Sequence, residues 1–126
     1  EPADIDRVGM TAALRRAFAA AIAEVEAQGV AVDVVLLDGN PLHLDPREVN
    51  VVKGDGKCAS IAAASLVAKV ARDHVMEAYA EQYPGYGFES NKGYGSEGHM
   101  AAIRERGLCP IHRRSFCSFA AQESLF

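Results

Sequence analysis

The chain opens with a helical pattern of hydrophobic positions. From Asp4 or Asp6 to Gln28, apolar side chains recur at intervals of three and four residues, which places them along one stripe of an α-helix. The stripe consists of Leu14, Phe18, Ala21, Ile22 and Val25. Gly29 follows, and glycine is a typical residue for ending a helix. The pattern predicts one amphipathic helix whose stripe faces a core.

Two short strands are predicted after this helix. Residues Val30–Leu37 form a nearly continuous run of β-branched and aliphatic side chains interrupted only by Asp33. Such a run is typical of a strand that is covered on both faces in a parallel sheet. The turn sequence Asp38-Gly39-Asn40-Pro41 ends it. Glu48–Lys53 is the second strand candidate, and Lys53-Gly54-Asp55-Gly56 ends it, so an aspartate followed by glycine closes both strands.

A long helix is predicted over Ser60–Gln82. Its first three turns are almost entirely small or aliphatic, which predicts burial nearly all round at that end, and it becomes amphipathic later. Residues 83–98 concentrate glycine and tyrosine, which favours a loop that serves as a contact surface. Ser96 fits the N-cap of a short helix that ends at Gly107, and the compact basic segment Pro110–Phe116 follows. The order of these elements indicates a single α/β domain.

Composition agrees with a folded domain and narrows its class. The chain has 126 residues, 49% of them hydrophobic, and a chain of this size buries roughly two-thirds of its unfolded surface, enough for a core. No run of about 18 apolar residues is present to span a bilayer. Its three cysteines are scattered and form no C-x-x-C pair, which favours a reduced, cytoplasmic protein without a disulfide framework or zinc site. Because the first residues already resemble a helix start, with no strand before them, the chain is also expected to be a piece of a longer domain.

Charge is distributed unevenly along the chain. Residues 1–52 hold four basic and nine acidic side chains, a net charge of −5, whereas residues 53–126 have a net charge of +1 within the total of −4. A weakly acidic total argues against indiscriminate nucleic-acid binding. It still allows a local basic surface in the second half.

Candidate chemistry lies at the predicted strand ends. In an open parallel sheet, ligands gather beyond the carboxyl ends of the strands, where Asp38 and Asp55 are expected. Two neighbouring carboxylates repel unless a cation lies between them, and hard oxygen ligands suit Mg²⁺ or Mn²⁺. The alternative is that both Asp-Gly pairs are ordinary turns, and the pattern alone leaves the two interpretations about even. Lys53 and Lys57 flank Asp55, but the spacing is not that of a P-loop.

The remaining polar candidates favour structural roles. Asp73 lies one helical turn after Lys69 and is interpreted as a carboxylate that orients a neighbouring lysine or arginine. The four histidines have no partner at a metal-ligand spacing, which makes metal ligation by them a poor hypothesis. His112 either braces the C-terminal segment or contacts nucleic acid.

Several blocks of the sequence resemble the bacterial type 2 ribonucleases H, the ribonuclease HII family. They are VVKGDGKCASIAAASLVAKVARDHVM at 51–76, YPGYGF at 83–88, KGYGS at 92–96 and PIHRRSF at 110–116. The blocks VVLLDGN at 34–40 and ADID at 3–6 extend the resemblance over nearly the whole chain. It implies an RNase H-like α/β fold, here with two sheet strands, a long buried helix and shorter helices.

The resemblance implies an endonuclease that hydrolyses the RNA strand of RNA–DNA hybrids and cuts 5′ to ribonucleotides embedded in duplex DNA. Its active site would be four carboxylates holding two Mn²⁺ or Mg²⁺ ions, of which Asp38 and Asp55 match the third and fourth. Tyr94 corresponds to the tyrosine that packs on the sugar at the RNA-to-DNA junction. Lys53, Lys92, Arg113 and Arg114 are candidates for holding phosphates, although each is more often a solvated charge. A monomer is implied when the protein is full length.

One departure from the family pattern lies at the start of the chain. The Asp-Glu-Ala-Gly-Arg-Gly block of the family's first strand is absent, and with it two of the four carboxylates. We therefore expect residues 1–126 to be the carboxyl-terminal part of such a domain, with weak metal binding and little cleavage alone. Two other classes stay open: a non-catalytic module that binds hybrid or duplex, and a nucleotide-binding α/β module with residues 53–57 as its phosphate turn.

Overall fold

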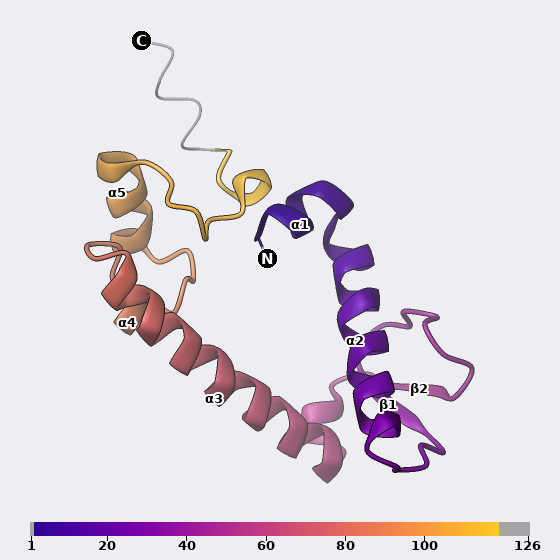
Figure 1. Ribbon diagram of the computed structural model, residues 1–126. Helices are drawn as coiled ribbons and strands as arrows, with labels where there is room; N and C mark the ends of the chain where they lie inside the picture. Colours follow the sequence, from indigo (N-terminus) through magenta and orange to yellow (C-terminus); the bar gives the residue numbers. More distant parts are fainter. Residues whose placement is uncertain (1, 119–126) are drawn as a thin grey trace. The chain divides into compact units, whose positions relative to one another are not determined.

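A computed structural model describes residues 2–118 of the chain. Its elements follow in the order α1 (Pro2–Val8), α2 (Met10–Ala27), β1 (Val35–Asp38), β2 (Glu48–Val51), η1 (Gly54–Gly56), α3 (Ala59–Gln82), α4 (Phe88–Asn91), α5 (Glu97–Arg106) and η2 (Arg114–Phe116) (Figure 1). Within the described part, residues 7–67 form one unit, and residues 2–6 with 68–118 form the other. No helix among the described residues is long and apolar enough to cross a membrane.

The first unit contains the predicted parallel strand pair. β1 and β2 lie side by side in parallel, with Val35 opposite Glu48 and Asp38 opposite Val51 (Figure 1). This confirms the parallel sheet, but β1 has only four residues and begins five positions later than predicted. The expected cover on both faces is wrong for the described residues: Leu37 is buried, whereas Leu36 is 40% exposed. A two-stranded sheet has too little surface around it to bury alternate side chains on both faces.

The first predicted helix is divided in two. Gly9 adopts a φ of +82° between α1 and α2, a conformation that glycine tolerates and an L-residue in a helix does not. The end of the pattern is as predicted, because α2 stops at Ala27 and Gly29 has a φ of +83°. The apolar stripe of α2 is only half-buried at Phe18 and Ile22, and none of the residues of α2 is fully buried.

The long helix has the predicted length, but its predicted burial is wrong. α3 covers Ala59–Gln82, yet Leu66 and Val67 in its first half are 64% and 70% exposed. Ile61 is buried at the start of the helix and Met76 near its end. The sequence between them is aliphatic enough for a core, but the described residues supply no side chains to pack against it.

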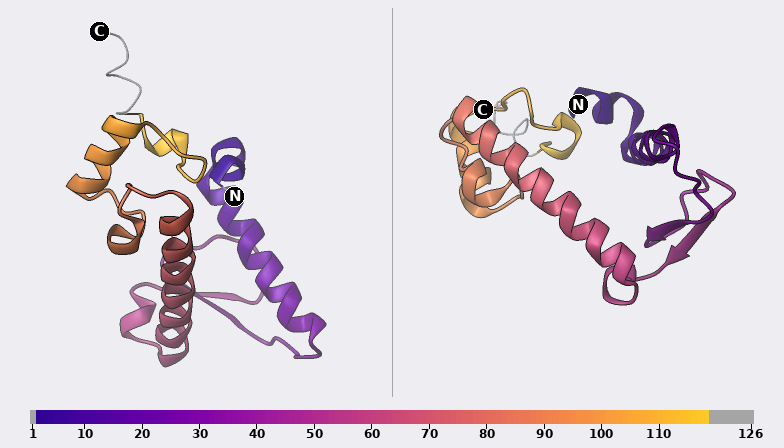
Figure 2. Two further views of the ribbon diagram at one scale, coloured as in Figure 1. Left: turned by 60° about the vertical axis from the view of Figure 1, so that its left-hand side comes forward. Right: turned by 60° about the horizontal axis from the view of Figure 1, so that its bottom comes forward.

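The core of the second unit lies at the C-terminal end of α3, where α4 and α5 pack against it (Figure 2). The buried side chains are Met76, Tyr86, Phe88 and Ile103. Ser96 caps α5 as predicted, since its hydroxyl accepts a hydrogen bond from the backbone N–H of His99, and Gly107 ends the helix. The loop expected to be a contact surface is in part core: the rings of Tyr86 and Phe88 stack with centroids 5.5 Å apart, while Tyr94 is 65% exposed.

Candidate functional site

Asp38 at the end of β1 is linked directly to the turn that carries Asp55. Its Oδ1 accepts a hydrogen bond of 2.7 Å from the backbone N–H of Gly54. Asp55 is the next residue, in the 3-10 turn η1, and its Oδ1 accepts from the N–H of Gly56 at 2.9 Å. Both carboxylates are exposed, and the second oxygen of each has no partner among the described residues. The end of β1 is thus hydrogen-bonded to the turn that carries Asp55, and both carboxylates have an accessible oxygen.

Gly54 is the residue that allows this link. A Cβ at position 54 would lie 2.6 Å from Cδ1 of Ile61 and 3.3 Å from Cβ of Val51. It would also lie 3.4 Å from Oδ1 of Asp38. The absence of a side chain lets the turn fit between β2 and the start of α3. A side chain at position 54 would therefore have to displace Ile61 and crowd Val51.

The substitution Gly54→Ala tests this packing. Because the added methyl group overlaps Ile61, we expect it to lower the free energy of unfolding by about 1–3 kcal/mol and to shift the Asp38 contact. Urea unfolding followed by far-UV circular dichroism measures the change. Gly56→Ala is the matched control, since a Cβ there meets nothing within 4 Å. Equal effects of the two substitutions would contradict the role given to Gly54.

The basic residues beside Asp55 are held by the same turn. Lys53 has a φ of +55° and precedes η1, so the backbone reverses direction there. Its side chain is exposed next to the acidic turn. Lys57 donates from Nζ to the backbone carbonyl of Val52 at 2.8 Å, which directs its charge back onto the turn. Lys57 is therefore held against the turn, whereas the side chain of Lys53 has no hydrogen-bond partner among the described residues.

The connection between the strands is fixed by charged residues that sequence reasoning did not single out. The carboxylate of Glu48 accepts hydrogen bonds from three successive backbone N–H groups, those of residues 42–44. The pKa of Glu48 lies below its usual range chiefly because of the bond from Leu44. Arg47 donates to both oxygens of Asp45 and lowers the pKa of that carboxyl to about 2. The charged sequence Asp45-Pro46-Arg47-Glu48 was the available signal for these interactions, but the hydrogen-bond partners of its side chains depend on the loop conformation.

Arg47 also ties this loop to the rest of the unit. Its Nη1 donates to Oε1 of Glu26 at 2.6 Å and to the carbonyl of Val32 at 2.8 Å. Arg15 of α2 adds a bond from Nε to the carbonyl of Leu42 at 2.9 Å. These bonds connect α2, the approach to β1 and the loop before β2. Together they fix the strand pair that carries Asp38.

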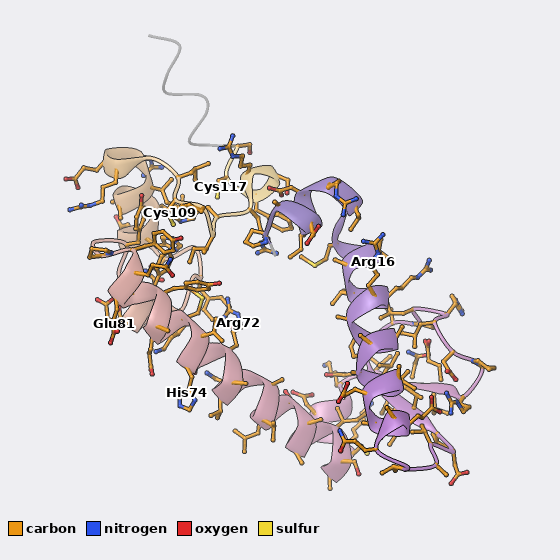
Figure 3. All side chains as sticks on the ribbon, viewed as in Figure 1. Arg16, Arg72, His74, Glu81, Cys109 and Cys117 are labelled. Atoms are coloured by element: carbon orange, nitrogen blue, oxygen red, sulfur yellow. The ribbon has the colours of Figure 1, made fainter. Side chains whose placement is uncertain are left out.

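Tyr94 is presented on the surface of the second unit. The guanidinium carbon of Arg72 lies 4.9 Å from the centroid of the Tyr94 ring, and the side chains of Arg72 and His74 point to opposite sides of α3 (Figure 3). Gly93 before it has a φ of +76°, and a Cβ there would lie 3.1 Å from Cε of Met76. The close approach of this loop to α3 places the tyrosine over the arginine.

Charged side chains surround this tyrosine. Asp73 accepts a hydrogen bond from Nζ of Lys69 at 2.8 Å, as predicted, and the lysine is the main reason that the pKa of Asp73 is lowered. Lys92 donates from Nζ to Oε1 of Glu77 at 2.6 Å, so the candidate phosphate ligand is paired with a carboxylate. Both pairs belong to α3 and the loop that carries Tyr94.

The basic segment after α5 is anchored by the first helix of the chain. Asp6 accepts hydrogen bonds from the backbone N–H groups of Arg114 and Ser115 and from the Ser115 hydroxyl. The bond from that hydroxyl is the main reason that the pKa of Asp6 is lowered. Arg113 lies over the Phe116 ring at 4.0 Å. The structure thus places Asp38, Asp55 and Lys53 in one unit, and Tyr94, Lys92 and Arg113 in the other.

A buried histidine pair was also missed by the sequence analysis. His99 and His112 are 5% and 9% exposed, and their Nε2 atoms lie 3.0 Å apart. His99 Nδ1 contacts the carbonyl of Tyr94 at 2.8 Å, and Cys109 contacts His112 Nδ1 through both its backbone nitrogen and its sulfur at 3.0 Å. Of the two roles considered for His112, the structure supports the brace. The only sequence signal was two histidines in segments that otherwise look like a helix start and a basic turn.

The carboxylates of Asp38 and Asp55 provide only part of a binding site for a hard divalent cation. Asp38 and Asp55 supply the carboxylate oxygens that Mg²⁺ and Mn²⁺ prefer, and such ions keep several water ligands. Residues 2–118 hold no cluster of three or more histidine, cysteine, aspartate or glutamate side chains arranged to bind a metal. Two carboxylates are enough to share an ion with further ligands, but they do not enclose one.

Comparison with known proteins gives consistent matches. The family model for ribonuclease HII matches residues 2–119. The chain is 49% identical over 105 residues to a ribonuclease HII of Bacillus licheniformis, covering 83% of this chain and 41% of that protein. It is 46% identical over 129 residues to a ribonuclease HII of Maricaulis maris, covering 100% of this chain and 58% of the relative. The chain thus spans about half the length of the curated relatives it matches.

Proposed function

This chain belongs to the ribonuclease HII family, and from that membership we propose that it forms part of an endonuclease acting on RNA paired with DNA. The substrates would be RNA–DNA hybrids and duplex DNA that contains a single ribonucleotide, with cleavage of the phosphodiester 5′ to the ribonucleotide. The observation that carries the proposal is the hydrogen bond between Asp38 and Gly54, since it joins the end of β1 to the turn that carries Asp55.

Asp38 and Asp55 are proposed to hold Mn²⁺ or Mg²⁺ through their unpartnered oxygens. When bound, a pair of such ions activates the attacking water and stabilises the leaving 3′ oxygen. Asp38 is oriented by the N–H of Gly54, so its remaining oxygen has a fixed direction. Lys53 beside the turn would neutralise a phosphate that approaches the carboxylates. In this proposal, Asp38 and Asp55 bind the ions, and Lys53 helps to orient the phosphate that is cleaved.

Tyr94 and the basic side chains of the second unit are proposed to bind the duplex. An exposed aromatic plane tolerates every base and senses the sugar beside it, which suits an enzyme that recognises a junction without reading sequence. Lys92 and Arg113 would contact phosphates. Lys92 is held by Glu77 at 2.6 Å, so its ammonium has a defined position before the substrate arrives.

Binding by the 126-residue chain tests the substrate proposal. We expect the chain in Mn²⁺ to bind a duplex carrying one ribonucleotide about tenfold more tightly than the same duplex in all-DNA form, which corresponds to about 1.4 kcal/mol. Fluorescence anisotropy at fixed ionic strength measures both affinities. Equal affinities for the two duplexes would contradict the role of this chain in selecting ribonucleotides.

Cleavage of the same labelled duplex separates the enzyme from a binding module. Because the family resemblance implies four carboxylates and only Asp38 and Asp55 match them in this sequence, we expect little cleavage by the chain in Mn²⁺. Cleavage 5′ to the ribonucleotide at the rate of a complete ribonuclease HII would overturn that expectation. Salt-dependent binding that Mn²⁺ leaves unchanged would favour the non-catalytic module.

A further inference from the structure

We propose that Arg72 is a substrate-binding residue whose guanidinium supports the ring of Tyr94 and holds a phosphate of the nucleotide whose sugar packs on that ring. Arg72 lies in α3, and its guanidinium carbon is 4.9 Å from the centroid of the Tyr94 ring. The inference rests on the role proposed above for Tyr94 in recognising the sugar. It adds the cation that binds the backbone of the same nucleotide.

The backbone before the tyrosine brings the two side chains together. Gly93 has a φ of +76°, and a Cβ at this position would lie 3.1 Å from Cε of Met76 and 3.6 Å from Nη2 of Arg72. Met76 is buried, so the loop packs on a fixed part of α3. The guanidinium therefore lies beside Gly93 as well as over the ring of Tyr94.

The supported ring stays accessible to a ligand. Tyr94 is 65% exposed although Arg72 lies over its ring. The backbone that carries the ring is held in place, because the Tyr94 carbonyl accepts hydrogen bonds of 2.8 Å from the N–H of Ser96 and from Nδ1 of His99. A ring has two faces, and a cation over one of them leaves the other for a sugar.

The N–H groups of Arg72 are available to a ligand. A guanidinium has five N–H donors, and Arg72 makes no hydrogen bond or ion pair with any of residues 2–118. The side chain is also exposed. A cation over an aromatic ring interacts with it through its positive charge, so this contact leaves the N–H donors free. The arginine can therefore bind a phosphate without leaving the tyrosine.

The two lysines beside this ring have carboxylate partners, unlike the arginine. Nζ of Lys69 donates to Asp73 at 2.8 Å, and Nζ of Lys92 donates to Glu77 at 2.6 Å. Each carboxylate cancels part of the attraction of its lysine for a phosphate. Asp73 also feels the charge of Arg72, but its hydrogen bond goes to the lysine, which is the main reason that its pKa is lowered. The charge of Arg72 is thus the least offset of the three.

The chemistry of arginine suits both contacts at once. Its planar guanidinium packs on aromatic rings and donates to two phosphate oxygens in parallel, whereas a lysine ammonium is a point charge. A phosphate lies next to every sugar of a nucleic-acid strand, so a cation beside the ring meets one in any sequence. Arg72 and Tyr94 together would bind one nucleotide at its phosphate and its sugar without reading its base.

Salt-dependent binding tests the phosphate contact in the 126-residue chain. Arg72→Gln removes the charge but keeps a polar side chain, and Arg72→Lys keeps the charge but loses the planar set of donors. Arg16→Gln is the matched control, since it removes the same charge from an exposed residue of α2 (Figure 3). Fluorescence anisotropy in Mn²⁺ measures the affinities for the single-ribonucleotide and all-DNA duplexes at about 50–200 mM salt.

The slope of log affinity against log salt concentration counts the phosphate contacts. One contact contributes about 0.9 to this slope, so Arg72→Gln should reduce its magnitude by about that much on both duplexes. Its affinity at the lowest salt concentration should fall at least about tenfold, the size of one hydrogen bond between charged groups. Arg72→Lys should keep the slope with a smaller loss of affinity, and Arg16→Gln should keep the slope and stay within about twofold in affinity. An unchanged slope in Arg72→Gln, a reduced slope in Arg72→Lys, or an equal reduction in Arg16→Gln would overturn the contact.

A double-mutant cycle tests whether the two side chains bind one nucleotide. Arg72→Gln should weaken binding of the single-ribonucleotide duplex at least about twofold less in a Tyr94→Leu chain than in the unaltered chain, because residues that contact each other and share a ligand are coupled. Independent, additive losses would overturn the shared nucleotide. If the unaltered chain binds the two duplexes equally but Arg72→Gln still reduces the slope, the proposed sugar recognition fails and the phosphate contact stands. Absence of salt-dependent binding to both duplexes would overturn the two together.

Discussion

Replacing Phe88 with alanine is expected to lower the free energy of unfolding of its unit by about 3–5 kcal/mol, the usual cost of removing a fully buried phenylalanine. The Phe88 ring is 1% exposed, stacks on Tyr86 and lies edge-on to His99. Truncation would leave a cavity between α4 and α5 that the surrounding rings fill only in part. The same cavity would loosen the histidine pair, because both imidazoles use this ring as a wall.

Tyrosine fluorescence during urea unfolding measures this change selectively. The chain has no tryptophan, and its four tyrosines all lie in residues 68–118, so the signal comes from the unit that contains Phe88. Phe116→Ala is the matched control: this ring is 56% exposed, and its loss is expected to cost less than about 1 kcal/mol. Similar losses for the two substitutions would show that Phe88 is not the centre of this core.

Changing Asp38 to asparagine is expected to weaken Mn²⁺ binding at least about tenfold while leaving the fold intact. Removing a residue that only hydrogen-bonds to a metal ligand lowers metal affinity by about 10–100-fold. Removing the charge of a ligand itself is expected to lower the affinity at least as much. The asparagine Oδ1 can still accept the hydrogen bond from Gly54, which preserves the link between the strand ends. The substitution therefore separates the charge of Asp38 from its structural role.

Calorimetric titration with Mn²⁺ gives the affinity, and far-UV circular dichroism shows whether the fold is kept. Asp33→Asn removes the same charge from an exposed residue in the same unit and is the control for general electrostatic attraction. We expect the Asp33 variant to bind Mn²⁺ within about twofold of the unaltered chain, as a distant screened charge has little effect. Equal weakening by both substitutions would contradict a ligand role for Asp38.

Local signals in the sequence predicted the elements well because each depends on neighbouring residues. The parallel pairing of β1 and β2 follows from two short runs that end in Asp-Gly turns. The cap at Ser96 and the end of α5 at Gly107 follow from the preference of these residue types for helix ends. The break at Gly9 had a signal too: glycine within a helix costs about 1 kcal/mol and permits a positive φ.

Burial could not be predicted in the same way, because it depends on which segments meet. The sequence of the aliphatic half of α3 predicts a buried helix, yet Leu66 and Val67 are mostly exposed in the described structure. The sequence predicts that Tyr86 belongs to an exposed contact loop, yet this residue is buried beside Phe88. The candidate site shows the same limit: Asp38 and Asp55 were found from the strand ends, but the role of Gly54 depends on the position of Ile61.

The exposed aliphatic residues of α3 have a practical consequence for handling the chain in concentrated solution. Leu66, Val67 and Val70 keep apolar surface in contact with water, and strongly excluded salts such as sulfate raise the free energy of such surface. The solubility of the chain therefore depends on the kind of salt as well as on ionic strength. Chloride buffers of moderate concentration favour a dispersed sample for titration and spectroscopy, whereas ammonium sulfate favours precipitation.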